Sequence, residues 1–238
     1  MALEGHMNDR ELMDVQVETL FRRDPDGRLV SANEEHAPPV PRFFLGRMRH
    51  ANLWLSRHDL PANIVRELDR LGWREPVAPT FSGARPATYE AIRATLQADA
   101  PIVAEYFGAS YVFPDSANAP RGIVAVSPAQ AALLQGPMER FVARLRTDQP
   151  CQAIVENGVA LSVAYTWRWT GCAVAVGVYT LEGYRGRGYA SAVVAAWGAA
   201  MRRAGRLAFY GHAWDNAASQ AVTRHLGLHL IGDEINFV

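Results

Sequence analysis

Hydrophobic and polar positions follow their most regular patterns in the second half of the chain. Residues 128–146 predict a helix that Gly136-Pro137 should kink. Residues 151–169 predict a β-hairpin, because Asn157-Gly158 between two apolar runs is the strongest short hairpin signal. The almost continuous apolar run 172–179 predicts a strand that is covered on both faces.

A glycine-rich turn and a second helix follow that strand. Five residues fall at i, i+3, i+4, i+7 and i+11, so they form one apolar helix face: Ala190, Val193, Val194, Trp197 and Met201. Beyond Gly205, residues 206–213 predict a strand, and 214–227 predict a helix capped by Asp215 or Asn216. Residues 228–238 predict a short terminal hairpin. The unit therefore reads strand, glycine turn, helix, strand, helix.

The first half of the chain shows strand and turn signals. Residues 24–27 predict a turn that leads into a short strand, and two strands are expected around a bend near 50–52. A helix is expected over 59–72 with Asp59 as its cap, and another over 88–97. Between them, 74–90 is rich in Pro, Gly, Ser and Thr and reads as a soft linker. His50, His58 and Trp54 form no convincing site.

These patterns predict a mixed α/β (α+β) protein. We expect a smaller N-terminal α/β domain over residues 1–115 and a second domain over 116–238, with 1–6 as a possible tag remnant. The chain has 238 residues, of which 49% are hydrophobic, which is enough to form two compact units.

Composition then narrows the classes of function. The formal net charge is zero, so the overall field gives no reason to expect a nucleic acid or a membrane surface as a partner. Two cysteines are too few for a disulfide framework or a structural zinc site. All 24 basic residues are arginine, which excludes a lysine-containing phosphate loop and a Schiff-base lysine. With no long apolar run and no signal segment, we expect a soluble cytoplasmic protein.

The glycine turn carries the strongest chemical signal. It reads Arg185-Gly186-Arg187-Gly188 and runs directly into a helix. Backbone N–H groups and the positive end of the helix dipole meet there, which favours a phosphate or pyrophosphate. A dinucleotide fingerprint would need a third glycine at Ser191, where there is none. An RNA-binding Arg-Gly tract would repeat and would carry a series of aromatic residues, and this one occurs once.

Two segments resemble the GNAT superfamily of N-acetyltransferases. The stretch VYTLEGYRGRGYASAVVAAW is similar to its acyl-CoA pyrophosphate motif, with Arg185, Gly188 and Ala190 in the three defining places. WDNAASQAVTRHLGL is similar to its second motif, with Asn216 at a coenzyme-contacting position and 225–228 as the helix ending. The resemblance covers about residues 121–238 and implies a GNAT-type, mainly antiparallel sheet with flanking helices, with the first half as an N-terminal extension.

The resemblance also implies a function and a set of site residues. It implies transfer of an acetyl group from acetyl-CoA to an amine of a small molecule or peptide, by direct attack and without a metal. A GNAT-fold module that senses acyl-CoA without turnover is the alternative, and a homodimer is possible. The residues implied at the coenzyme are Val178, Thr180, Arg185, Gly186, Arg187, Gly188, Tyr189, Ala190, Ser191, Asn216 and Ser219.

The two usual proton carriers of the family are absent from the matching positions. Ala175 stands where many relatives have a glutamate base, and Thr223 stands where many have a tyrosine acid. His212 is the preferred substitute for the base, and Thr223 could at most orient a water molecule. Other substitutes within reach are Tyr210, Glu182 and Asp215, and an acceptor pocket could use Trp167, Trp169 and Trp214.

Overall fold

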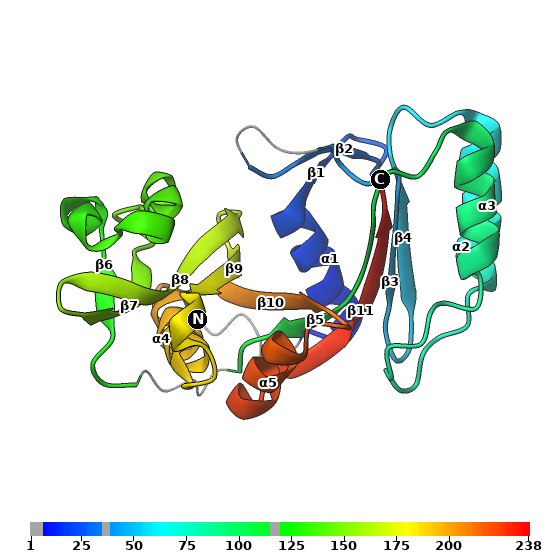
Figure 1. Ribbon diagram of the computed structural model, residues 1–238. Coiled ribbons are helices and arrows are strands. Elements are labelled where there is room, and N and C mark those ends of the chain that lie inside the picture. The colour runs from blue at the N-terminus through cyan, green and yellow to red at the C-terminus, as the bar shows by residue number, and fades with distance from the viewer. Residues whose placement is uncertain (1–6, 35–38, 115–119) are drawn as a thin grey trace. The chain divides into compact units, whose positions relative to one another are not determined.

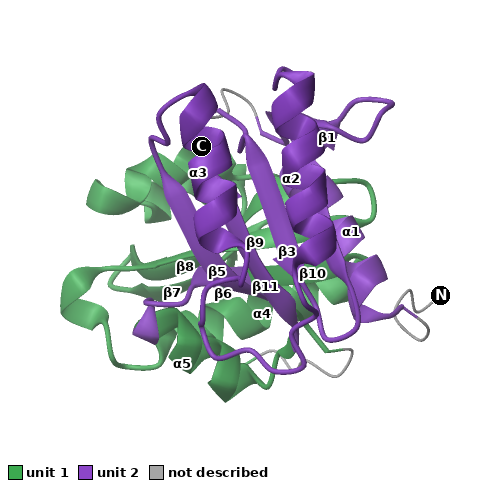
Figure 2. Cartoon of the chain, turned by 90° about the vertical axis from the view of Figure 1, so that its right-hand side faces the viewer, with its two compact units in different colours: residues 1–5, 112–210, 218–229 green, residues 6–111, 211–217, 230–238 purple. Residues whose placement is uncertain are grey.

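The computed structural model describes residues 7–34, 39–114 and 120–238 (Figure 1). The chain forms two compact units, coloured separately in Figure 2. Unit 1 contains the described residues of 112–210 and 218–229, and unit 2 contains those of 6–111, 211–217 and 230–238. The expected tag remnant at 1–6 and the expected boundary between 115 and 116 lie outside the described residues, and the two-domain division stays a prediction.

Unit 1 is built around a run of strands in the order β10-β9-β8-β7-β6, of which β10 belongs to this unit up to Tyr210 and has its last residues in unit 2. The pairs β6/β7, β7/β8 and β8/β9 are antiparallel, and β9/β10 is parallel. The strands are β6 (Val124–Val126), β7 (Cys151–Glu156), β8 (Val159–Trp169), β9 (Ala173–Thr180) and β10 (Leu207–Ala213). The helices are α4 (Tyr189–Arg203) and α5 (Ala217–Leu226), with 3₁₀ segments η1 (Pro128–Leu133), η2 (Gly136–Arg144) and η3 (Glu182–Tyr184).

Helix α4 packs on this sheet through the apolar face that its sequence predicts. Trp197 is completely buried, and its indole N–H donates to the Thr166 hydroxyl on β8 at 3.2 Å. Successive side chains of β8 point to opposite faces of the sheet. Val163 therefore packs on the other face, with Met138 and Phe141 of η2. The core of unit 1 therefore lies on both faces of the central strands.

Unit 2 contains a second run of strands in the order β4-β3-β11-β5. Its strands are β3 (Phe43–Arg47), β4 (Asn52–Ser56), β5 (Glu105–Val112) and β11 (His229–Phe237), beside a separate antiparallel ribbon of β1 (Phe21–Arg23) and β2 (Leu29–Ala32). Helices α2 (Ala62–Arg74) and α3 (Tyr89–Asp99) cover one face, and α1 (Asp9–Leu20) lies on the other (Figure 1).

The mixed α+β class with a mostly antiparallel sheet is confirmed, as is the hairpin at Asn157-Gly158, where φ is 49° and 76°. Three local predictions are wrong. Residues 128–146 form two short 3₁₀ segments, because the pair Gly136-Pro137 starts a new segment and does not merely kink a helix. Asp59 does not cap α2, which begins after Pro61; its carboxylate instead accepts from Arg57 at 2.6 Å.

The third error concerns the C-terminus, where one strand replaces the expected hairpin. β11 runs without a turn and pairs with β3 from Asp233↔Arg47 to Phe237↔Phe43. Gly232 lets the backbones of β11 and Arg47 approach closely, because a Cβ at that position would lie 2.1 Å from the Arg47 carbonyl oxygen. Helix α1 was not predicted; it begins with a capping box between Asn8 and Glu11.

None of the helices in the described ranges is long and apolar enough to cross a membrane. Within the same ranges, no cluster of three or more His, Cys, Asp or Glu side chains is placed to hold a metal ion.

Candidate functional site

Helix α4 begins without a side-chain cap. Gly188 is its N-cap residue, and the first helical hydrogen bond runs from the Ala192 N–H to the Gly188 carbonyl at 3.1 Å. The N–H groups of Tyr189, Ala190 and Ser191 therefore have no carbonyl partner within the helix. The first turn contains no acidic residue. The positive end of the helix dipole is thus left without a negative charge of its own helix.

Two glycines shape the turn before this helix. Gly186 has φ of 74° and Gly188 has φ of 78°, a left-handed conformation that other residues adopt at a cost. A Cβ built at either position would meet no atom within 4 Å. Glycine is therefore required here by backbone conformation, while the space above the turn is open to a ligand.

The two arginines of the motif are exposed, and Arg187 also interacts with the Tyr189 hydroxyl. Arg185 Nε donates to the Thr180 carbonyl at 3.4 Å. Arg187 Nη2 donates to the Gly183 carbonyl at 3.2 Å, and its guanidinium lies 5.0 Å from the Tyr184 ring centroid. In the described part of the chain, no carboxylate forms an ion pair with either arginine. Both positive charges are therefore available to an anion at the turn.

Strand β9 leads into this turn, and one of its edges is largely unpaired by β10. The pairing of β10 with β9 consists of Leu207↔Ala173, Ala208↔Val174 and Phe209↔Ala175, so it ends at Ala175 while β9 continues to Thr180. The Leu181 N–H donates to the Leu161 carbonyl of β8 at 2.9 Å. Because successive residues of a strand point their backbone groups to opposite edges, those of Val178 and Thr180 point away from β8. The Thr180 carbonyl that binds Arg185 agrees with this assignment.

The residues expected around α5 are placed in both units. Asn216 belongs to unit 2 and is exposed, and its N–H donates to the Ala213 carbonyl at 3.0 Å. Ser219 belongs to unit 1 and lies beside Tyr210. Burial raises the pKa of the Tyr210 phenol above its ordinary value, and a hydrogen bond with Ser219 partly offsets this. Thr223 is buried, and its hydroxyl donates to the Gln220 carbonyl at 3.0 Å.

His212 is a buried residue of unit 2 and is 4% exposed. Its ring stacks on Tyr111 with centroids 5.3 Å apart and meets Trp214 edge-on at 6.3 Å. Nδ1 lies 3.0 Å from the Ala213 carbonyl oxygen, which can only accept a hydrogen bond. Nδ1 therefore carries the proton, and Nε2 carries the lone pair that a general base needs.

Three other sequence candidates have surroundings that favour structural roles. Ala175 is buried in β9. Trp167 and Trp169 of β8 are each covered by an arginine: the Arg168 guanidinium lies 4.2 Å from the Trp167 ring, and that of Arg146 lies 4.6 Å from the Trp169 ring. Glu182 and Asp215 are exposed.

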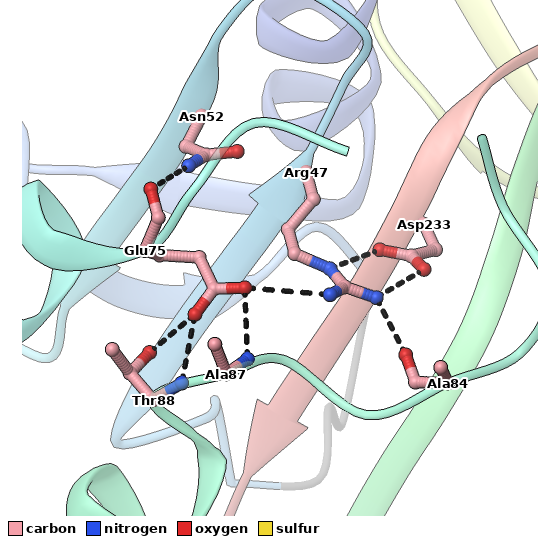
Figure 3. A network of polar contacts seen from close by, with 7 residues as sticks. All are labelled: Arg47, Asn52, Glu75, Ala84, Ala87, Thr88 and Asp233. Atoms are coloured by element: carbon pink, nitrogen blue, oxygen red, sulfur yellow. Dashed lines mark hydrogen bonds and ion pairs between the residues drawn. The ribbon is translucent and has the colours of Figure 1, made fainter. Parts of the chain in front are cut away.

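A buried polar network in unit 2 escaped the sequence analysis (Figure 3). Arg47 donates to both Asp233 oxygens, at 2.8 and 2.7 Å, and its Nη1 donates to Glu75 at 3.3 Å. Burial alone would lower the pKa of Arg47, but hydrogen bonding and Coulomb attraction to Asp233 and Glu75 raise it. Glu75 also accepts from the Thr88 N–H at 2.8 Å and from the Ala87 N–H at 3.1 Å. This network fixes both ends of a segment that reads as a linker in the sequence.

Comparison with known proteins gives similar solved structures only. No family model matches the chain, and no curated protein sequence matches it either. A Novosphingobium aromaticivorans protein assigned to the GNAT acetyltransferase family has a TM-score of 0.47 and 18% identity, over 58% of this chain and 65% of that one. A GCN5-related N-acetyltransferase-like protein from Streptococcus suis has a TM-score of 0.45 and 14% identity, over 83% and 84% of the two chains.

A third structure is yncA of Salmonella typhimurium, which was solved with acetyl-CoA; its TM-score is 0.37 and its identity 19%, over 48% of this chain and 92% of that one. The chain spans less than two thirds of the length of the Novosphingobium protein. At these TM-scores and identities, the similarities identify neither the family nor the activity of this chain, so its function is argued from its own residues.

Proposed function

We propose that the chain is an acyl-CoA-dependent N-acyltransferase that transfers an acetyl group to an amine of a small molecule or peptide. The observation that carries the proposal is the uncapped start of α4, which adjoins the unpaired edge of β9 through the turn 181–188. The start of α4 suits a pyrophosphate, and the edge of β9 suits an extended chain of amide groups. Acyl-CoA contains both in one molecule.

The turn would hold the pyrophosphate. Its donors are the N–H groups of Tyr189, Ala190 and Ser191, which lack partners within α4, together with the side chains of Arg185 and Arg187. The open space above Gly186 and Gly188 lets the anion approach the backbone. Charge-assisted hydrogen bonds of this kind contribute about 1.5–3 kcal/mol each.

The unpaired edge of β9 would hold the amide-containing arm of the coenzyme. The backbone groups of Val178 and Thr180 point to this edge, where they can accept and donate as in an added strand. Gly177 leaves no room for a larger residue, because a Cβ there would lie 2.3 Å from the Tyr165 ring. The packing of Tyr165 against Gly177 therefore fixes the position of the β9 edge that the coenzyme would contact.

Acyl-CoA supplies an activated thioester carbonyl, which an amine can attack directly. The new N–C bond forms as the C–S bond breaks, the amine loses one proton, and the departing thiolate takes one up. The proposed acceptor of the amine proton is Nε2 of His212, directly or through water. In the tautomer described above, the ring proton is on Nδ1, so Nε2 can accept a proton. Thr223 already donates its hydroxyl proton to a backbone carbonyl, so its proposed role is limited to accepting a hydrogen bond from water.

Turnover is the experiment that tests this function. Purified protein is incubated with acetyl-CoA and a panel of amines, and the released thiol is measured. We expect release that depends on both substrates, and a loss of about 10² or more at neutral pH in His212→Ala. Coenzyme binding without release across the panel at any pH would favour the sensor function instead. A loss below about threefold in His212→Ala, with coenzyme affinity unchanged, would remove His212 from the mechanism.

A further inference from the structure

Arg85 lies between two aromatic rings of unit 2. Its guanidinium is 4.7 Å from the Tyr89 ring centroid and 4.9 Å from the Phe107 ring centroid. The residue is nevertheless exposed. A guanidinium that stacks on rings keeps its N–H groups at its edge, where they can meet a planar anion with two parallel hydrogen bonds.

The donors of Arg85 are unused. Among the residues that the structure describes, none accepts a hydrogen bond from this guanidinium or forms an ion pair with it. The carboxylate of Glu105 is already engaged, because it accepts from Tyr89 Oη at 2.6 Å and from Arg93 Nε at 2.8 Å. Glu105 attracts Arg85 electrostatically but accepts none of its N–H groups, so Arg85 is a stacked cation whose donors are unused.

The backbone on both sides of Arg85 is fixed by the network of Figure 3. Arg47 Nη2 donates to the Ala84 carbonyl at 2.8 Å, and the Ala87 N–H donates to Glu75 at 3.1 Å. Arg47 and Glu75 are both buried. Because the backbone is anchored and the Arg85 side chain is stacked, binding a ligand costs little conformational entropy. This pre-organisation favours affinity.

An aromatic surface continues from Arg85 toward His212. The Phe107 ring lies 6.3 Å from the Trp214 ring, and Trp214 lies 6.3 Å from His212. The Trp214 N–H donates to the Phe107 carbonyl at 3.1 Å, which holds the two residues together. Gly83 packs beside Trp214, since its Cβ would lie 3.4 Å from that ring. The proposed base and the unpaired arginine therefore lie along one row of rings within unit 2.

We propose that Arg85 binds the carboxylate of the acceptor, so that the acceptor class is an amine that also carries a carboxylate. This inference rests on the proposed function for the amine, while the anion site itself rests on the contacts of Arg85. The rings of Phe107 and Trp214 would contact the apolar part of the acceptor. Arg85 is a binding and positioning residue and takes no part in proton transfer.

Matched pairs of ligands test the inference by calorimetry on the full chain with coenzyme A present. The pairs are L-phenylalanine with phenethylamine and L-leucine with isoamylamine, which differ only in the carboxylate. We expect the amino acids to bind at least tenfold more tightly than the amines. In Arg85→Gln this preference should disappear, and in Arg85→Lys it should be reduced. Arg66→Gln, which removes another exposed arginine of unit 2, is the control and should keep the full preference.

The outcomes separate this inference from the proposed function. Wild-type protein that binds neither ligand of a pair, or both equally, would overturn the carboxylate site, as would an undiminished preference in Arg85→Gln. A fall in coenzyme A affinity in Arg85→Gln would mean that Arg85 binds a coenzyme phosphate, and would also overturn it. Failure of coenzyme A to bind the wild type would refute the proposed function. Tighter binding of the amino acids than of the amines would still show whether Arg85 binds a carboxylate.

Discussion

Replacing Gly188 by aspartate tests the anion site with a single carboxylate. The substitution places a negative charge at the start of α4, where the N–H groups of Tyr189, Ala190 and Ser191 lack helical partners. No atom lies within 4 Å of the new Cβ, so the Cβ itself causes no steric clash. The cost to folding comes from φ of 78°, which is about 1–2 kcal/mol for a residue other than glycine. A chain of this size should lose roughly 2–8 °C in Tm.

The effect on coenzyme affinity should be much larger than the effect on folding. The new carboxylate competes for the N–H groups and repels a pyrophosphate. Loss of two charge-assisted hydrogen bonds removes about 3–6 kcal/mol, which is roughly 10²- to 10⁴-fold in Kd. Calorimetric titration with acetyl-CoA measures this directly, and thermal unfolding monitored by circular dichroism shows that the variant is folded.

Two controls isolate the charge from the backbone strain. Gly188→Ala carries the same strain without the carboxylate, so we expect a similar loss of Tm and a much smaller loss of affinity. Gly122→Asp introduces the same charge at φ of 79°, also in open space, and should leave coenzyme affinity unchanged. Unaltered affinity in folded Gly188→Asp would refute the assignment of the anion site. An equal loss of affinity in Gly188→Ala would mean that backbone conformation, and not charge, controls binding.

Three further predictions concern stability and reactivity. Asp233→Asn should lower the free energy of unfolding in urea by about 3 kcal/mol, because buried Arg47 loses its bidentate partner; Asp59→Asn, at an exposed ion pair, should cost less than about 1 kcal/mol. Burial alone would raise the pKa of Glu105, but hydrogen bonds from Tyr89 and Arg93 lower it below its usual 4.5. The ionised Glu105 carboxylate should therefore stabilise the folded protein fully above pH 4.5, and this stabilisation should be lost as the pH falls through the lowered folded-state pKa. The difference in free energy of unfolding between wild type and Glu105→Gln should shrink over the same pH range. Burial raises the pKa of Cys151 to about 12 while Cys172 is exposed, so iodoacetamide should label only Cys172 in the folded protein, and mass spectrometry should find Cys151 labelled only after unfolding.

Elements with local signals could be predicted from the sequence, and elements fixed by distant partners could not. The Asn157-Gly158 hairpin and the apolar face of α4 depend on residues within a few positions of one another. The pairing of β11 depends on Arg47, far away in the sequence, which lies opposite Asp233 and has its carbonyl close to Gly232. A Gly-Asp pair near a chain end reads as a turn when that partner is unknown.

The same distinction applies to the candidate site. Gly186 and Gly188 could be identified because a turn that points N–H groups at an anion needs glycine at defined positions. The row of Arg85, Phe107 and Trp214 could not, because its members come from separate segments, and Arg85 lies in a stretch whose composition is typical of a linker. The residues of the buried network that fixes this stretch are not regularly spaced in the sequence.

The missing proton carriers and the unpaired arginine point to the same kind of acceptor. A lysine-like amine with a pKa near 10.4 must lose a proton at a cost of about 4–5 kcal/mol at pH 7. Ala175 cannot supply a base, and buried His212 is the only proposed one. A peptide α-amino group, with a pKa near 7.7–8.0, costs only about 1 kcal/mol to deprotonate at pH 7. Such an amine can carry a carboxylate in the same molecule, which is the group that Arg85 is placed to bind. A small peptide acceptor would therefore need little help from a base, and its carboxylate would bind the arginine of this row whose N–H donors are unused.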